Sequence, residues 1–87
     1  MLLVVDFSDL GLEFDRTDIR IDNSADFTVG KLLNKLCNGI EKFGDTAIPN
    51  KSMLDLLDSN HNRLDATCKI RDISLNDWDI VYIVRRN

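Results

Sequence analysis

The sequence predicts an α+β fold in which one helix packs across one face of a mixed sheet of four to five strands. The first observation is the stretch 29–43, where apolar residues recur every three or four positions, as they do along one face of a helix. The second is a pair of short apolar, largely β-branched runs, 1–5 and 80–84, which are too short for helices and favour buried strands. The third is the length of 87 residues, which supports only one hydrophobic core. We therefore expect a single domain over residues 1–87.

Residues 1–7 predict the first strand. Successive side chains of a strand point to opposite faces, so Met1, Leu3, Val5 and Phe7 share one face. Since no leader precedes the run, we expect this strand to lie inside the sheet and not at its rim. The run is also far shorter than the roughly 20 residues that a membrane-spanning helix needs.

The next segment predicts a wide hairpin. Residues 8–11 favour a turn, and residues 12–15 fit either the start of a strand or an ordered loop. Residues 18–22 alternate as a half-exposed antiparallel strand does. The parity of Leu12 and Phe14 differs from that of Ile19 and Ile21, so one continuous strand would need a bulge. We therefore place the second strand near 16–22.

The helix is the most strongly patterned element. Residues 23–26 break the preceding strand, Thr28 is the expected N-cap, and Gly44 is the expected left-handed C-cap. Gly30 and Gly39 each cost about 1 kcal/mol of helix stability relative to alanine, which close packing would explain. The apolar stripe consists of Val29, Leu32, Leu33, Leu36, Cys37, Ile40 and Phe43.

The remaining residues predict short strands joined by turns. A loop over 45–51 contains the single proline, and a third strand covers 53–57. A tight turn at 59–62 leads to a short fourth strand at Arg63 and Leu64. Residues 74–79 are dense in Ser, Asn and Asp and predict a turn before the final strand at 80–84.

Three stretches of the chain carry a resemblance to a known family. They are Asp18 to Ile21, then Val29, Leu32 and Leu33, and above all Cys68, Lys69, Ile70, Asp72, Leu75, Asp79, Val81 and Ile83. With the order of elements, they resemble the β-grasp, ubiquitin-like fold, and most specifically the YukD/EsaB family, which is associated with type VII (WXG100) secretion in Gram-positive bacteria. The resemblance departs at Trp78, where the family usually has glycine, and in the 8–16 loop, which is longer than expected.

The resemblance implies that the first and last strands lie side by side and parallel at the centre of the sheet. Val81 and Ile83 would then join the core beneath the helix, and the alternate residues would form an apolar patch on the opposite face. One alternative is that Leu10, Leu12 and Phe14 fold over this patch, and another is a homodimer through it. The candidate protein-binding residues are Leu2, Val4, Ile80, Tyr82 and Val84.

The function that the resemblance implies is that of a non-catalytic, cytoplasmic adaptor in a type VII secretion system. Its partners would be protein components of that machinery, to which it would be recruited at the membrane without spanning it. The alternative is a ubiquitin-like modifier or carrier. Conjugation requires a flexible C-terminal Gly-Gly, whereas this chain ends in Val84, Arg85, Arg86 and Asn87, which disfavours that role.

Composition argues against several other functions. The formal charge of −4 and the lack of a basic cluster beyond Arg85 and Arg86 disfavour nucleic-acid binding. Two cysteines, Cys37 and Cys68, are too few for a disulfide-stapled domain, and no signal peptide is evident, so a reducing compartment is expected.

No residue cluster predicts a metal, a cofactor or catalysis. The stretch 58–62 imitates the start of a calcium loop, but Arg63, Asp65 and Lys69 stand where glycine, an apolar residue and glutamate are needed. We therefore predict a polar turn with a solvated His61.

The remaining reactive side chains have simpler interpretations. Cys37 lies on the helix stripe and fits a core position, while a thiol enzyme using Cys68 is a remote alternative. The cluster of Asp72, Asp77 and Asp79 could bind a metal or a basic partner, but such residues more often cap turns.

Overall fold

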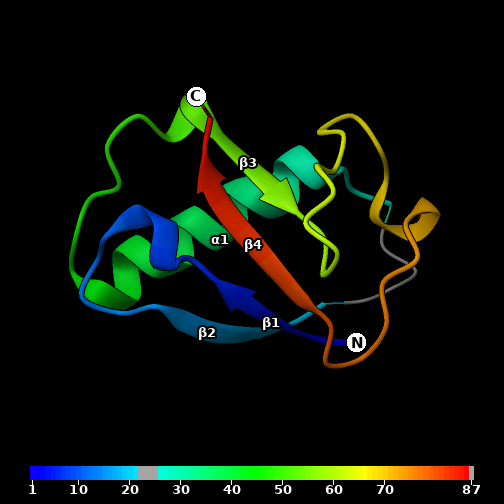
Figure 1. The fold of residues 1–87 in the computed structure, drawn as a ribbon, viewed down its shortest axis with the longest axis horizontal. Helices are drawn as coiled ribbons and strands as arrows, with labels where there is room; N and C mark the ends of the chain where they lie inside the picture. Colours follow the sequence, from blue (N-terminus) through cyan, green and yellow to red (C-terminus); the bar gives the residue numbers. More distant parts are fainter. Residues whose placement is uncertain (22–25, 87) are drawn as a thin grey trace.

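Four strands and one helix make up the fold. The computed structural model describes residues 1–21 and 26–86. The strands form one sheet in the order β2-β1-β4-β3, and α1 crosses one face of it (Figure 1). The predicted α+β fold is confirmed, with four strands. The elements are β1 (Leu2–Asp6), η1 (Ser8–Leu10), β2 (Arg16–Arg20), α1 (Val29–Gly44), η2 (Lys51–Met53), β3 (Leu54–Leu57), η3 (Ile70–Asp72) and β4 (Ile80–Arg85), where η marks a 3₁₀ turn.

The two terminal strands pair with each other at the centre of the sheet, as the β-grasp resemblance implies. β1 and β4 run parallel, with Val4 opposite Ile80 and Asp6 opposite Tyr82. A parallel pair needs a long crossover connection, and α1 lies within it. β2 and β3 pair antiparallel with β1 and β4 respectively, so they form the two edges of the sheet.

The core lies between α1 and the sheet. Leu3, Val5, Val81 and Ile83 alternate along the two central strands and are completely buried. Each such side chain stabilises the fold by about 1.5–3 kcal/mol relative to an exposed position. The helix contributes its own stripe of buried residues, which are Val29, Leu32, Leu36, Cys37 and Ile40.

The two ends of α1 differ in how well the sequence predicts them. The Thr28 hydroxyl accepts a hydrogen bond from the Lys31 N–H at 3.3 Å, so the predicted N-cap is confirmed. At the other end Gly44 is still helical, and the left-handed residue is Asp45, with φ 48°. Aspartate adopts this conformation more readily than most side chains, so glycine is not required there.

The predicted apolar stripe is wrong at its last member. Phe43 is 77% exposed, whereas the buried positions of α1 end at Ile40. The last turn of the helix lies beside the loop that precedes β2. There the Phe43 ring packs edge-on against the Phe14 ring, with centroids 5.5 Å apart.

The first hairpin is wide, as predicted. Residues 12–15 form an ordered loop and not a strand, and Leu12 packs against the core. β2 ends at Arg20, although Ile21 still exchanges two hydrogen bonds with Met1. The predicted last residue of this strand, 22, and residues 23–25 of the predicted break at 23–26 lie outside the described residues.

The second half of the chain differs from the prediction at three places. β4 runs one residue further than predicted, to Arg85. The strand at Arg63 and Leu64 was wrong, because Arg63 makes only an isolated bridge to Leu57. The Leu64 N–H still donates to the Leu56 carbonyl, but its side chain turns to pack on the core. Met53 belongs to η2, so β3 begins one residue later than predicted. Among the described residues, α1 is too short and too polar to cross a membrane.

Candidate functional site

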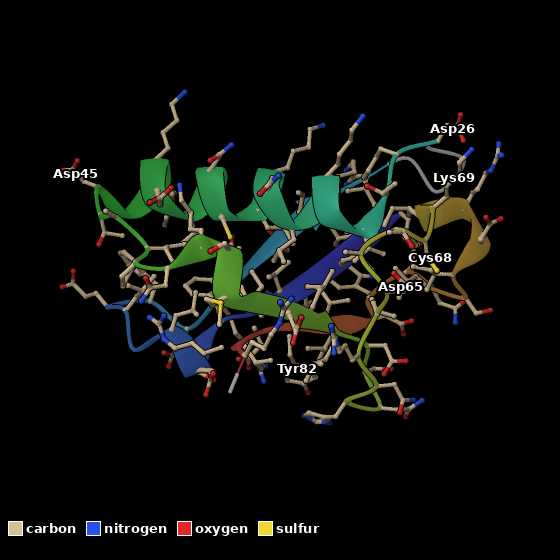
Figure 2. All side chains as sticks on the ribbon, turned by 90° about the horizontal axis from the view of Figure 1, so that it is seen from above. Asp26, Asp45, Asp65, Cys68, Lys69 and Tyr82 are labelled. Atoms are coloured by element: carbon tan, nitrogen blue, oxygen red, sulfur yellow. The ribbon has the colours of Figure 1, made fainter. Side chains whose placement is uncertain are left out.

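The candidate patch lies on the face of the sheet opposite α1, which we call the outer face. Its members alternate with the core residues along β1 and β4, and every one of them is half-buried. Figure 2 shows Tyr82 on the side of the sheet away from the helix. The outer-face strip consists of Leu2, Val4, Ile80, Tyr82 and Val84.

One ring of the strip is already covered within the chain. The imidazole of His61 stacks on the phenol of Tyr82, with ring centroids 4.3 Å apart and planes 22° apart. His61 has a left-handed backbone, with φ 65°, in the turn that follows β3. Sequence analysis predicted His61 as a solvated turn residue and missed this contact, which joins positions 21 residues apart in the sequence.

A charged residue, Asp6, follows Leu2 and Val4 on the same face of β1 and lies directly opposite Tyr82. The Asp6 carboxylate accepts hydrogen bonds from the Ser8 N–H and hydroxyl and from Arg16 Nε at 3.0 Å. Burial raises the pKa of Asp6, but the bonds from Ser8 and Arg16 outweigh it and leave the pKa below its ordinary value. The outer-face strip therefore ends, on β1, at the ionised Asp6 carboxylate, which is paired with Arg16.

A second ion pair borders the strip on the side of β3. The hydrogen bond from Arg86 lowers the pKa of Asp55, and the charges of Arg63 and Arg86 lower it further. Arg86 Nη2 lies 2.8 Å from Asp55 Oδ1, and Arg63 Nε lies 3.4 Å from the same oxygen. Asp55 is directly opposite Val84 in the sheet, so this ion pair flanks the strip on the side of β3.

Trp78 stands at the end of the strip near Leu2. Its side chain is 68% exposed, and its backbone is left-handed, with φ 70°. The Trp78 N–H donates to the Leu2 carbonyl at 2.7 Å, and the Asp77 carboxylate accepts from the Leu2 N–H at 2.7 Å. A bulky residue in this conformation is uncommon, because its Cβ crowds the backbone.

The apolar side chains of the first loop make their contacts elsewhere. Leu10 is part of the core, Leu12 packs against the core, and Phe14 meets Phe43 at the end of α1. These placements do not favour the alternative in which the loop folds over the outer face.

The aspartate-rich segments form turns, and Asp58 and Asp79 cap them as predicted, whereas the Asp77 carboxylate accepts from the Leu2 N–H of β1. Asp58 Oδ1 accepts from the N–H groups of Asn60 and Asn62. Asp79 Oδ2 accepts from the Asn76 N–H, in the turn before β4. Across residues 1–21 and 26–86, no three His, Cys, Asp or Glu side chains group closely enough to hold a metal ion.

The two cysteines lie in different environments. Cys37 is buried in the core, and burial raises the pKa of its thiol. Cys68 is exposed, and neighbouring Lys69 pairs with Asp26 at 2.9 Å (Figure 2). The lysine that could have activated Cys68 is therefore directed to a carboxylate.

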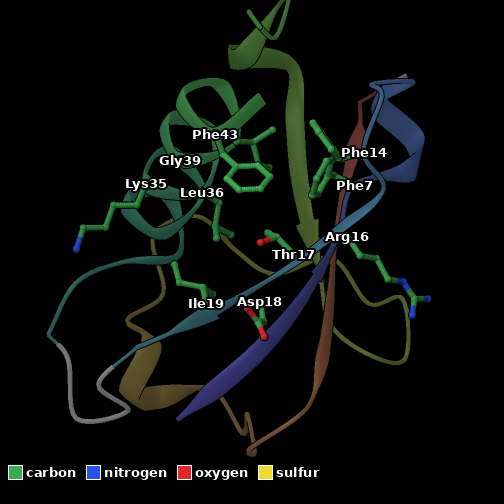
Figure 3. A pocket seen from close by; sticks show the side chains of 11 residues that line it. Phe7, Phe14, Arg16, Thr17, Asp18, Ile19, Lys35, Leu36, Gly39 and Phe43 are labelled. Atoms are coloured by element: carbon green, nitrogen blue, oxygen red, sulfur yellow. The ribbon is translucent and has the colours of Figure 1, made fainter. Parts of the chain in front are cut away.

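A groove between β2 and α1 is a feature that sequence analysis missed. Its volume is about 290 Å³, and its walls come from both elements (Figure 3). Thr17 and Ile19 point from β2 toward the helix, while Leu36 and Phe43 approach from α1. No pattern within either segment marks the groove, because it exists only where the two segments meet.

Comparison with known proteins shows the fold and nothing finer. No protein-family model matches the chain, and no curated protein matches it. Fifty-eight chains of solved structures match it in three dimensions. One is the structure described as "Molecular Mimicry of SUMO promotes DNA repair", with 20% sequence identity and a TM-score of 0.69 over 97% of this chain and 89% of that one. The chain therefore has a ubiquitin-like β-grasp fold.

Proposed function

We propose that this chain is a non-catalytic adaptor that binds a partner protein through its outer-face strip. The observation that carries the proposal is the arrangement of the strip itself. Leu2, Val4, Ile80 and Val84 are aliphatic and incompletely covered. The ion pair of Asp6 stands at one end of the β1 row, and the ion pair of Asp55 stands on the β3 side. An apolar centre within a polar rim is the usual composition of a protein interface.

Trp78 supports the same surface. An exposed tryptophan in a left-handed backbone makes no evident contribution to folding that a smaller residue could not make. Tryptophan is among the residues most enriched at the energetic centres of interfaces. We therefore include Trp78 in the binding surface, next to Leu2.

We further propose that the adaptor serves a type VII secretion system in the cytoplasm, with protein components of that machinery as its partners. The support is the resemblance of residues 68–83 to the YukD/EsaB family, together with the shared ubiquitin-like fold. Within that stretch Ile70, Val81 and Ile83 are buried, and the Asp79 carboxylate caps a turn. These residues explain how the stretch folds, so the link to secretion needs a direct test.

The test is a pull-down of the secretion ATPase and WXG100 proteins by the tagged chain. Val4→Asp and Tyr82→Asp each place a carboxylate in the apolar strip, which should reduce capture at least tenfold. Asn34→Asp, on the exposed surface of α1, is the matched control and should capture normally. Circular dichroism of each variant verifies that the fold is intact.

Two results would contradict the proposal. Undiminished capture by folded Val4→Asp and Tyr82→Asp variants would remove the outer-face strip from the interface. Mass spectrometry that finds the chain covalently attached to other proteins would favour the modifier alternative over the adaptor.

A further inference from the structure

The side of α1 that faces away from the sheet is basic. Its exposed residues include three lysines and no carboxylate. The one acid of the helix, Glu41, is turned to the following loop, where its carboxylate accepts from the Ile48 N–H and from Lys51 Nζ, each at 2.7 Å. The exposed residues of α1 are Lys31, Asn34, Lys35, Asn38, Gly39, Lys42 and Phe43.

The three lysines form one line along the helix, which we call the lysine row. At about 3.6 residues per turn, Lys31, Lys35 and Lys42 lie within about 40° of one another around the helix axis, and the row is about 16 Å long. Figure 3 shows the Lys35 side chain directed away from β2. Its Nζ lies 5.5 Å from the centre of the Phe27 ring, a contact that attracts the cation without cancelling its charge. The sequence does not show the row as a cluster, because its members are spread over three turns of the helix.

Positive charge that the fold does not pair is concentrated on this row. The chain has eleven lysines and arginines. Within the part of the chain that the structure describes, six of them pair with carboxylates, and Arg85 donates to the carbonyl oxygens of Leu10 and Pro49. Among the same residues, those with neither kind of contact are Arg20, Lys31, Lys35 and Lys42. Three of these four share one side of α1.

The charges beyond the two ends of the row differ. Past its last lysine, Glu13 and Asp45 line the same small hollow, and both residues are exposed. At the other end of the helix Asp26 is shared between Lys69 at 2.9 Å and Arg71 at 3.4 Å, which leaves an excess of positive charge (Figure 2). The positive surface therefore stops at the C-terminus of α1 and continues past its N-terminus.

We propose that the lysine row binds a short acidic segment of a partner protein. A lysine ammonium is a compact charge on a flexible stem, so the three side chains can follow carboxylates without a preformed pocket. About five residues of an extended chain, at about 3.3 Å each, span the row. Attraction between exposed charges acts over about 8 Å at physiological salt, so the segment has to lie along the helix to meet all three lysines.

A nucleic acid or an anionic bilayer fits this surface less well. Both are anions that extend far beyond the row, so they would also approach the exposed carboxylates of Glu13 and Asp45. The chain has a formal charge of −4 even with the lysine row included, so its other surfaces are acidic. A short segment that ends near Lys42 avoids this repulsion.

The lysine row and the outer-face strip lie on opposite sides of the molecule. The strip is on the face of the sheet away from α1, and the row is on the side of α1 away from the sheet. Both surfaces can therefore be occupied at once. An adaptor joins two partners, and the row supplies the second surface, so the inference extends the proposed function to a second, acidic partner.

A synthetic peptide tests the inference on the full chain. The probe is capped hexaglutamate, and the control is capped hexaglutamine, which has the same length and no charge. NMR titration should show saturable amide shifts between residues 31 and 42 with hexaglutamate and none with hexaglutamine. Raising the salt concentration from about 0.01 M to about 1 M shortens the Debye length from about 30 Å to about 3 Å, and should weaken the binding at least tenfold.

Two variants with the same change of charge locate the site. Lys35→Glu reverses the central charge of the row and should weaken hexaglutamate binding at least tenfold. Arg20→Glu is the matched control, since Arg20 is exposed on β2 and makes no ion pair among the described residues, and binding should stay within twofold. Lysine and glutamate have similar helix propensities, and circular dichroism verifies that both variants are folded.

The two proposals have separate readouts. Val4→Asp should impair only the pull-down of the outer-face partner, and Lys35→Glu should impair only the binding of hexaglutamate. Failure of one proposal is therefore distinguishable from failure of the other.

Three results would overturn the inference. The first is no saturable shift with hexaglutamate. The second is equal weakening by Lys35→Glu and Arg20→Glu, which would mean that the net charge of the chain attracts the peptide and not the row. The third is tighter binding of phosphatidylserine vesicles or of a deoxythymidine oligonucleotide than of hexaglutamate, lost on Lys35→Glu substitution, which would assign the row to a lipid surface or to a nucleic acid.

Discussion

At the scale of single residues, Trp78 combines a backbone conformation that is unfavourable for a large side chain with an indole that is mostly exposed. The left-handed backbone at φ 70° favours glycine, and the indole is largely exposed, so burial offsets little of the strain. Sequence analysis marked Trp78 only through a resemblance, as a place where glycine is expected. Only the structure shows the left-handed backbone of Trp78 and the hydrogen bond from its N–H to the Leu2 carbonyl.

Trp78→Gly should increase the free energy of unfolding by up to about 1 kcal/mol, because glycine adopts the left-handed conformation without steric crowding. Urea denaturation measures the change. Trp78→Ala is the control, since it removes the indole but keeps a Cβ at positive φ, and it should give no gain. A destabilised Trp78→Gly variant would show that the indole contributes to the fold.

At the scale of elements, two of the three glycines of α1, Gly30 and Gly39, lie in opposite kinds of surroundings. Helix propensity alone predicts that either Gly→Ala substitution stabilises the helix. The surroundings divide them, because Gly39 faces open space and Gly30 approaches the Ala66 carbonyl, to which its N–H donates at 3.0 Å.

Gly39→Ala should raise the free energy of unfolding by about 0.5–1 kcal/mol. Gly30→Ala should gain less or lose stability, because the new Cβ at 3.3 Å from the Ala66 oxygen forces one backbone segment to shift. Parallel urea denaturation of the two variants measures the difference. Equal gains would mean that the contact at Gly30 yields without cost.

Sequence patterns predicted the elements where one periodic signal dominates. The spacing of Val29, Leu32 and Leu36 identified α1, and Thr28 identified its first turn. The prediction failed at Phe43 because the helical period continues after the sheet no longer lies beneath it. It failed again at Arg63, where a single bridge replaces a strand. Both errors concern where one element stops contacting another, which no local pattern records.

At the scale of the whole molecule, the sequence predicted one surface and missed the other. The outer-face strip follows from the two-residue period of β1 and β4 once those strands are placed side by side. The groove depends on how far α1 lies from β2. The apolar spacing that predicts each of these elements contains no information on the distance between them. The position of its lining residue Gly39 was visible, but only the structure shows the space beside it.

Acid sensitivity is also a property of the whole fold, because its ion pairs join distant segments. Asp6 pairs with Arg16 across the first hairpin, and Asp55 pairs with Arg86 across β3 and the end of the chain. In both aspartates the folded-state pKa lies below the ordinary value of 3.8. A lowered pKa stabilises the folded state fully above the ordinary value, and the contribution is lost as pH falls below it.

Asp55→Asn should therefore cost about 1 kcal/mol at neutral pH, where the carboxylate is ionised and hydrogen-bonded to Arg86. Near pH 3 the cost should shrink, because protonation weakens the same interaction in the unsubstituted protein. Urea denaturation of both proteins at the two pH values measures this dependence. Asp18→Asn is the matched control, since the carboxylate of Asp18 is exposed and makes no ion pair among the described residues. If Asp55→Asn lowers the free energy of unfolding by the same amount at both pH values, ionisation of Asp55 does not stabilise the fold.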